Sequence, residues 1–336
     1  MDYRKISLRR WIAWQIPALL IFGAAPAAAQ QSSWNTNASG EYQVPANWTG
    51  GVPTGFDAAM FARGAGASYS VSLPGGPTTL VSQIIVEAND VTLTSSDPLA
   101  KFRAFGSDRE EERGLYVGRQ QTGAIFTMDM NDFQVRTATV GHEANSHGTI
   151  NIGRAEAVMW IADFSDDQIP ANFILGRYGA GVLDVTGGWA FMIGDHSDAH
   201  FGRYAGGSGV ANIIGPTANL SVGGGHVIGF AGYGELNVAG GGLVQSFSNS
   251  VLGAVEGGVG EARVTGAGTQ WRNFSRLVVG DEGEGRLRIE QGAKTTSNNA
   301  WIGYDVTGRG SVEIDGAGSF WDVLYTLEVG VFGVAN

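Results

Sequence analysis

The sequence has 336 residues, of which 53 are Gly, 9 are Pro and none is Cys. Gly is at more than twice its usual share of about 7%. Each Gly inside a helix costs about 1 kcal/mol relative to Ala, which excludes a mainly helical protein. Collagen is excluded because no strict Gly-X-Y period occurs. The absence of Cys excludes disulfide scaffolds, zinc ribbons and thiol catalysis. We therefore expect a turn-rich, all-β protein.

The first 29 residues have the composition of a secretory signal peptide. Four basic residues within the first ten are followed by an apolar run over 11–22 and by small residues that end at Ala27-Ala28-Ala29. The alternative is an uncleaved membrane anchor, because residues 11–29 are nearly long enough to cross a bilayer. Pro17 and Pro26 favour cleavage. We expect export through the inner membrane, with residues 1–29 removed.

The remaining chain is acidic. Residues 1–29 carry four basic residues and one acidic residue, so their removal changes the formal net charge from −11 to −14. Such a surface repels phosphate backbones unless it carries a local basic patch. The arginines are scattered along the sequence, and the only lysines after residue 29 are Lys101 and Lys294. We expect no nucleic-acid partner.

From about residue 115 a repeated unit dominates the sequence. Each copy has two or three apolar residues, a Gly, a polar Gly-rich turn and an alternating segment. The recurring glycines are Gly118, Gly141, Gly176, Gly202, Gly229, Gly253, Gly280, Gly303 and Gly330. Their spacing is 23 to 27 residues, apart from one interval of 35 between Gly141 and Gly176. A period of this size indicates a solenoid, propeller or array.

The inside of each unit favours a parallel β-helix. Segments such as 182–185, 235–238 and 286–289 alternate apolar and polar residues, which is typical of a half-buried strand. No helical periodicity separates these segments, and a propeller blade needs about 40 residues or more. Residues 115–336 are therefore expected to form coils that stack apolar positions on one another, with Gly at the corners. Residues 30–114 are less regular and are expected to form an N-terminal cap and the first strands.

Two of the units share a specific motif. Residues 264–271 and 314–321 both read hydrophobic-x-Gly-Ala-Gly-Ser/Thr-x-Trp, and each is followed by Leu-x-Val-Gly, at 277–280 and 327–330. This repeat resembles that of passenger domains in autotransporter (type V secretion) proteins. The start, from Asn47-Trp48 to Phe61, is similar to the starts of such passengers.

The resemblance covers about residues 30–336 and is most specific from residue 250 onward. It implies a right-handed parallel β-helix with an N-terminal capping segment, displayed at the outer membrane or cell surface or released outside the cell. The leading expectation is a non-enzymatic, adhesin-like protein whose partner is a host-surface or matrix glycan or protein. That family carries a C-terminal translocator β-barrel, which this sequence lacks. Either the sequence is truncated before the barrel, which is the expectation that we favour, or the passenger is delivered another way.

The alternative function is a polysaccharide-degrading enzyme, either a glycoside hydrolase or a lyase. The long interval predicts a projecting loop over 155–170 that carries Asp163, Asp166 and Asp167. Paired carboxylates can cleave glycosidic bonds, one as an acid and the other as a base or nucleophile. His226, which follows three glycines, is the nearest additional candidate for such a site. A solvated loop is the simpler interpretation, so the enzymatic reading stays the alternative.

A second polar cluster comprises Asp195, His196, Asp198 and His200. Two imidazoles and two carboxylates can ligate a divalent metal, but a solvated turn is the interpretation that we favour. We expect no metal and no other cofactor.

The tryptophans divide into two groups by their place in the repeat. Trp271, Trp301 and Trp321 occupy repeat positions and are expected to stack in the core. The other group falls outside the strict repeat and supplies candidates for exposed contact; it comprises Trp34, Trp48 and Trp160.

Overall fold

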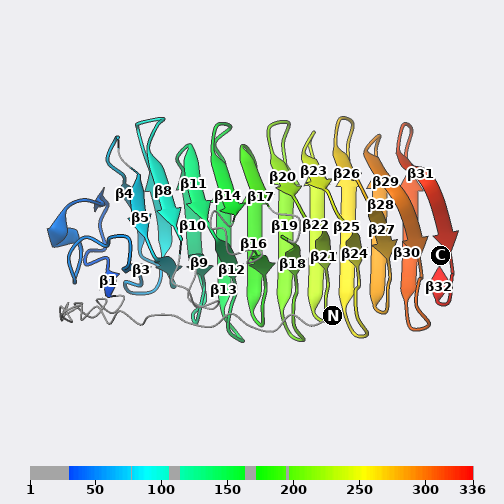
Figure 1. Cartoon of the computed structure of the whole chain (residues 1–336), viewed down its shortest axis with the longest axis horizontal. Helices are drawn as coiled ribbons and strands as arrows, with labels where there is room; N and C mark the ends of the chain where they lie inside the picture. Colours follow the sequence, from blue (N-terminus) through cyan, green and yellow to red (C-terminus); the bar gives the residue numbers. More distant parts are fainter. Residues whose placement is uncertain (1–29, 77, 106–113, 163–171, 194–196, 336) are drawn as a thin grey trace, which may run out of the picture.

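The computed structural model of the chain describes residues 30–76, 78–105, 114–162, 172–193 and 197–335. These residues form a parallel β-helix, drawn in Figure 1 as a row of coils that runs from the N-terminal to the C-terminal part of the chain. The only helical element among them is a short 3-10 helix, η1 (Pro45–Asn47). Nowhere in this described part does a helix reach the length and hydropathy that a membrane span requires. The predicted all-β, parallel β-helix class is confirmed.

Three ladders of parallel strands make the walls of the helix, and one coil contributes a strand to each wall. The first ladder contains β1 (Gln31–Ser33), β3 (Ala58–Phe61), β6 (Gln83–Val86), β9 (Gly114–Val117), β12 (Thr137–Val140), β15 (Asn172–Leu175), β18 (Ala199–Phe201), β21 (His226–Ile228), β24 (Ser250–Leu252) and β27 (Arg276–Val279).

The second ladder contains β5 (Thr79–Val81), β8 (Lys101–Ala104), β11 (Asp132–Val135), β14 (Val158–Ala162), β17 (Trp189–Ile193), β20 (Asn219–Val222), β23 (Leu243–Ser246) and β26 (Gln270–Asn273). Two long strands, β29 (Lys294–Ile302) and β31 (Phe320–Val329), continue both the first and the second ladder.

The third ladder forms a separate sheet of 12 strands. It contains β2 (Gly40–Glu41), β4 (Ser68–Ser72), β7 (Asp90–Thr94), β10 (Ala124–Asp129), β13 (His147–Ile152), β16 (Ala180–Val185), β19 (Ser208–Ile214), β22 (Tyr233–Ala239), β25 (Val259–Thr265), β28 (Glu284–Glu290), β30 (Arg309–Asp315) and β32 (Val334–Ala335).

The core is one continuous stack of inward side chains. Along each strand buried and exposed residues alternate, as in the pattern of β22. Register partners in neighbouring coils bury the same row, for example Leu183, Ala211 and Leu236 in the third ladder. Each coil therefore covers the apolar face of its neighbour, which is how a solenoid is stabilised.

Aromatic rings fill the N-terminal end of the stack. Trp34 and Trp48 are buried, and their ring centroids lie 5.1 Å apart in an edge-to-face arrangement. Trp48 Nε1 donates a hydrogen bond to the Tyr42 carbonyl oxygen at 2.7 Å. The prediction that Trp34 and Trp48 are exposed contact residues is therefore wrong. Both rings cover the first coil because large aromatic surfaces gain the most from burial there.

The recurring glycines all occupy corners. Every one of the nine has a positive φ, between 63° and 75°, a region that side chains other than Gly rarely adopt. A Cβ on Gly176 would lie 2.0 Å from the backbone oxygen of Ser208 in the next coil. The corner role predicted from the repeat is confirmed, and the close approach of the coils makes it stricter than backbone conformation alone requires.

A second row of glycines had no counterpart in our sequence analysis. It runs along the third ladder in consecutive strands and comprises Gly148, Gly181, Gly209, Gly234, Gly260, Gly285 and Gly310. A Cβ at any of these positions would lie 2.1–2.4 Å from a backbone atom. The first and third walls therefore meet too closely here for any side chain.

The long interval between Gly141 and Gly176 contains a strand where the sequence predicted a projecting loop. Residues 158–162 form β14, which pairs in register with β11 and β17. The first part of the predicted projecting loop over 155–170 is therefore wrong, because 158–162 complete the second wall of their coil. Residues 163–171 lie outside the described part of the chain.

Candidate functional site

His226 lies inside the helix, where no polymeric substrate reaches it. Its side chain is fully buried, and its Nδ1 is 2.9 Å from Ser246 Oγ. The ring also meets Trp271 edge to face, with centroids 6.3 Å apart. The alternative enzymatic function needs His226 at the surface of a coil, whereas its side chain lies in the core. Asp163, Asp166 and Asp167 lie outside the described residues.

Burial of His226 makes the stability of the fold depend on pH. Burial lowers the pKa of this imidazole to about 3, whereas an unfolded chain titrates near pH 6.5. Between these values the unfolded state binds more protons, so the free energy of unfolding falls as the pH drops from 6.5 toward 3. We expect His226 to contribute a loss of about 2 kcal/mol at pH 5 relative to pH 7. Urea denaturation at several pH values measures this loss of stability.

The variant His226→Leu is the control for this effect. It has no ring to protonate, so the fall in stability between pH 7 and pH 5 should be smaller by about 2 kcal/mol than in the parent chain. His200 contributes a similar slope, because its burial, reinforced by Arg203, lowers its pKa to about 4. An unchanged pH profile in His226→Leu would contradict the prediction.

The predicted metal cluster is represented in the described residues by Asp198 and His200. Asp198 Oδ1 accepts a hydrogen bond from the Gly225 N–H at 2.7 Å, which ties one coil to the next. His200 is half-buried, and its ring meets that of Phe230 edge to face, with centroids 6.2 Å apart. Asp195 and His196 lie outside the described residues. Within the described ranges, no three His, Asp or Glu side chains are grouped as metal ligands.

Three arginines that are scattered in the sequence fall at equivalent corners. Arg119, Arg177 and Arg203 each follow a recurring Gly. Backbone hydrogen bonds join the corners from coil to coil, with the His142 corner between those of Arg119 and Arg177. Each guanidinium lies over a tyrosine ring, for example Arg203 at 5.5 Å from the Tyr204 centroid. The solenoid thus builds a local basic row that we did not expect from the sequence. The absence of a nucleic-acid partner stays a prediction.

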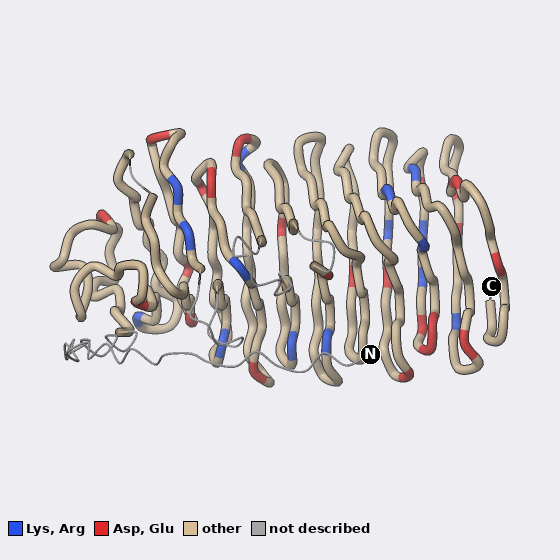
Figure 2. The backbone as a smooth tube through the Cα atoms, viewed as in Figure 1, with Lys and Arg blue, Asp and Glu red and all other residues tan. Residues whose placement is uncertain are grey.

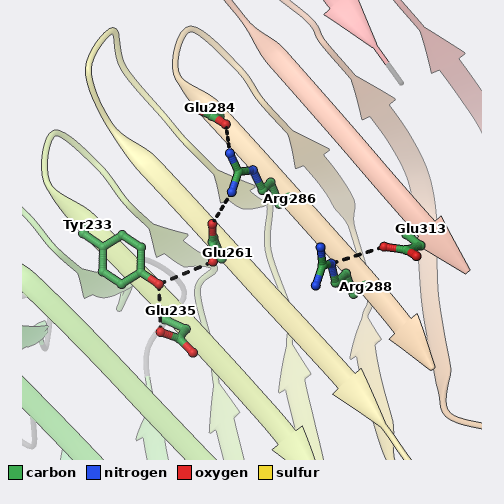
Figure 3. A network of polar contacts seen from close by, with 7 residues as sticks. All are labelled: Tyr233, Glu235, Glu261, Glu284, Arg286, Arg288 and Glu313. Carbon is green, nitrogen blue, oxygen red and sulfur yellow. Dashed lines mark hydrogen bonds and ion pairs between the residues drawn. The ribbon is translucent and has the colours of Figure 1, made fainter. Parts of the chain in front are cut away.

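The outer face of the third ladder carries a polar network that extends over four strands, shown in Figure 3. The Tyr233 hydroxyl on β22 donates to Glu235 at 2.8 Å and approaches Glu261 on β25 at 3.4 Å. Arg286 on β28 pairs with the same Glu261 at 2.9 Å and also with Glu284. Burial, reinforced by these carboxylates, raises the pKa of Tyr233, which keeps its hydroxyl a donor.

The network continues along the adjacent row of the same face. Arg288 pairs with Glu313 of β30 at 3.3 Å. Toward the N terminus, the Asn237 amide donates to Asn212 at 3.0 Å, and Asn212 donates to Asp184 at 2.7 Å. Figure 2 shows that charges of both signs occur along the whole stack. The outer face of the third ladder is thus a wall of aligned donors and acceptors.

A shallow groove of about 250 Å³ follows this wall. Its lining comprises Glu235, Asn237, Glu261, Ala262, Arg263, Arg286 and Arg288. Exposed ion pairs contribute little to folding, because water already solvates both partners. The arrangement therefore offers a partner a pattern of charges at little cost to the stability of the coils.

Removing one of these charges should barely affect stability. We expect Arg286→Ala to change the free energy of unfolding by less than about 1 kcal/mol, since half of the side chain is exposed. Chemical denaturation of the parent chain and of Arg286→Ala measures this change in the free energy of unfolding. A loss of several kcal/mol would show that the network holds the coils together.

Comparison with known proteins gives one distant relative. The chain is 26% identical over 183 residues to the protein named "Uncharacterized lipoprotein YdeK" of Escherichia coli (strain K12). The alignment covers 53% of this chain and only 13% of that protein. No family model matches the chain, and no solved structure matches it. The chain is therefore similar to a small part of a much longer protein.

Proposed function

We propose that this chain is an exported protein that works by non-covalent contact, as an adhesin-like passenger of autotransporter type. The observation that carries the proposal is the alignment of outward side chains in rows across consecutive coils, as in the network of Figure 3. Such rows extend along the helix axis and present a long, repetitive surface. A partner that is itself extended, such as a matrix glycan or a surface protein, matches this geometry.

Two observations support export. The first 29 residues have the order of a secretory signal peptide, and the distant relative is named a lipoprotein. None of the 336 residues here is Cys, so no thiol of this sequence can carry a lipid. Display at the cell surface or release outside the cell is the location that we propose.

The test has an attachment arm and a turnover arm. The chain lacking residues 1–29 is applied to immobilised matrix proteins and glycans, and the same preparation is incubated with soluble polysaccharides to measure reducing ends and unsaturated products. We expect attachment without turnover. Both properties should be unchanged in Asp166→Ala and Asp167→Ala.

The turnover arm also decides the alternative function. Release of sugar fragments that is lost in Asp166→Ala or Asp167→Ala would replace the contact function with that of a polysaccharide-degrading enzyme. Absence of attachment to every immobilised partner would also count against the proposal.

A further inference from the structure

Two aromatic side chains from consecutive coils stack on the outer face of the second ladder. Trp160 of β14 and Phe191 of β17 are register partners, with ring centroids 4.9 Å apart and planes 14° from parallel. Trp189, also on β17, places its ring 4.9 Å from that of Phe191 and is 42% exposed. We call these three residues the aromatic platform. Trp160 is the one member that the sequence identified as a candidate for exposed contact.

Uncharged polar side chains border the platform on both sides along the helix axis. In the row of Trp160 and Phe191, the register partners are Gln134 on one side and Ser221 on the other. In the parallel row, Asn219 is the register partner of Trp189. The platform therefore has the Gln134 amide on one side. On the other side it has the Ser221 hydroxyl and the Asn219 amide.

The two amides have oxygens that are not satisfied. Gln134 donates its Nε2 to Asp132 at 2.9 Å, but its Oε1 accepts no hydrogen bond from any described residue. Asn219 Oδ1 likewise has no donor within the described part of the chain. Both residues are at least nine-tenths buried, with 7% and 6% of their surface exposed. Buried acceptors without a partner are rare in folded proteins and call for an explanation.

We infer that the aromatic platform and these two amides form a binding site for a neutral glycan chain lying along the helix axis. The C–H face of a sugar ring is apolar and packs on flat aromatic rings. Gln134 Oε1 and Asn219 Oδ1 are covered in the unbound chain, so each side chain turns outward to accept a hydrogen bond from the hydroxyl edge of the sugar. The inference deepens the proposed contact function, on which it rests, by naming one site and one class of partner.

The surroundings of the platform favour a neutral polymer. Five successive positions of the row, from Gln134 through Trp160, Phe191 and Ser221 to Gln245, carry no charge. Single-stranded nucleic acids also stack on aromatic rings, but their sites line the backbone with basic side chains. An acidic polysaccharide also needs basic side chains to neutralise its carboxylates. The nearest basic residues of the row, Arg103 and Arg272, lie one coil beyond Gln134 and one coil beyond Gln245, so none stands beside the rings within the row.

The site can be tested by affinity electrophoresis of the chain lacking residues 1–29. Native gels contain mixed-linkage β-glucan, galactomannan or dextran, and gels without polysaccharide give the reference mobility. We expect at least one neutral polysaccharide to retard the protein. Trp160→Ala and Trp189→Ala should each weaken retardation by about tenfold, and Gln134→Leu should weaken it as well.

Phe247→Ala is the matched control. Phe247 stacks on Phe274 with centroids 4.9 Å apart and is 54% exposed, but this pair follows the ends of β23 and β26 instead of lying on the strand row. Retardation should be unchanged in this variant. Trp160→Phe keeps a flat ring in the coil and should retain most of the retardation. Circular dichroism confirms that each variant is folded.

Three results would overturn the inference. They are mobility unchanged by all three neutral polysaccharides, equal losses in Phe247→Ala and Trp189→Ala, or retardation by polygalacturonate or an oligonucleotide through Trp160 instead. These results are distinguishable from failure of the proposed function. Attachment to immobilised partners without neutral-glycan binding refutes only the site, whereas binding followed by cleavage of the glycan refutes only the non-enzymatic role.

Discussion

Gly176→Ala is expected to lower the free energy of unfolding by more than about 4 kcal/mol. The added Cβ would lie 2.0 Å from the Ser208 backbone oxygen, and the residue has a φ of 68°. The left-handed conformation alone costs a side chain about 1–2 kcal/mol. The contact can be relieved only by moving the Gly176 and Ser208 coils apart, which lengthens the hydrogen bond from the Arg203 N–H to the Gly176 oxygen. Urea denaturation followed by circular dichroism measures the loss.

Gly206→Ala separates the contact from the backbone conformation. Gly206 has a φ of 85° at a neighbouring turn, but a Cβ there would meet no atom within 4 Å. Only the conformational cost applies, so the loss should be about 1–2 kcal/mol. If the two variants lose the same stability, the close approach of the coils is not what demands Gly at position 176.

Trp271→Ala is expected to cost about 3–5 kcal/mol, as is usual for removing a large buried aromatic ring. Trp271 is fully buried in β26, and its Nε1 donates to Ser246 Oγ at 3.3 Å. Truncation leaves a cavity between coils and removes the edge contact with His226. Thermal and chemical denaturation measure the loss, and a change below about 1 kcal/mol would contradict the assigned place of this ring in the core.

Trp301→Ala is the control, because Trp301 is a tryptophan at a different repeat position, in register with Val278. Trp301 points outward from β29, stacks on Tyr304 with centroids 4.1 Å apart, and carries Arg276 over its face at 3.4 Å. A surface stack and one cation–π contact are worth about 1–2 kcal/mol together. The variant should therefore lose clearly less stability than Trp271→Ala.

These two tryptophans show where sequence reasoning succeeded and where it stopped. The prediction that Trp271, Trp301 and Trp321 stack in the core holds for Trp271 and, at the last described coils, for Trp321, which is partly buried and packs against the core. It is wrong for Trp301, which lies on the outer surface. A shift of one residue along a strand moves a side chain to the opposite face. Repeat spacing alone does not resolve a difference of that size.

The corners were predictable for a physical reason. A sharp turn with positive φ requires Gly, and the turn recurs once per coil, so its signal repeats at the period of the fold. The row that includes Gly209 and Gly234 was equally visible at the second position of seven consecutive strands of the third ladder. The strand prediction rests on apolar alternation, which gives no signal for positions that require the absence of a side chain.

The surface rows were not predictable in the same way. Trp160 was flagged, but its stacking partner Phe191 lies 31 positions later and meets it only through the register of β14 with β17. The networks of Tyr233, Glu261 and Arg286 likewise join residues about one coil apart. Such contacts depend on the exact number of residues in each coil, which a pattern with intervals from 23 to 35 leaves open.

The in-register stacking of the coils bears on how such a gene changes in length. Each unit meets its neighbours through the same corner Gly and the same backbone pairing, as at Gly229, Gly253 and Gly280. Tandem duplication of one unit therefore inserts a segment that already fits both flanks. Strands stack at about 4.8 Å, so each copy would lengthen the molecule by that distance. Recombination can thus adjust the reach of such a protein in small, regular steps without redesigning its interior.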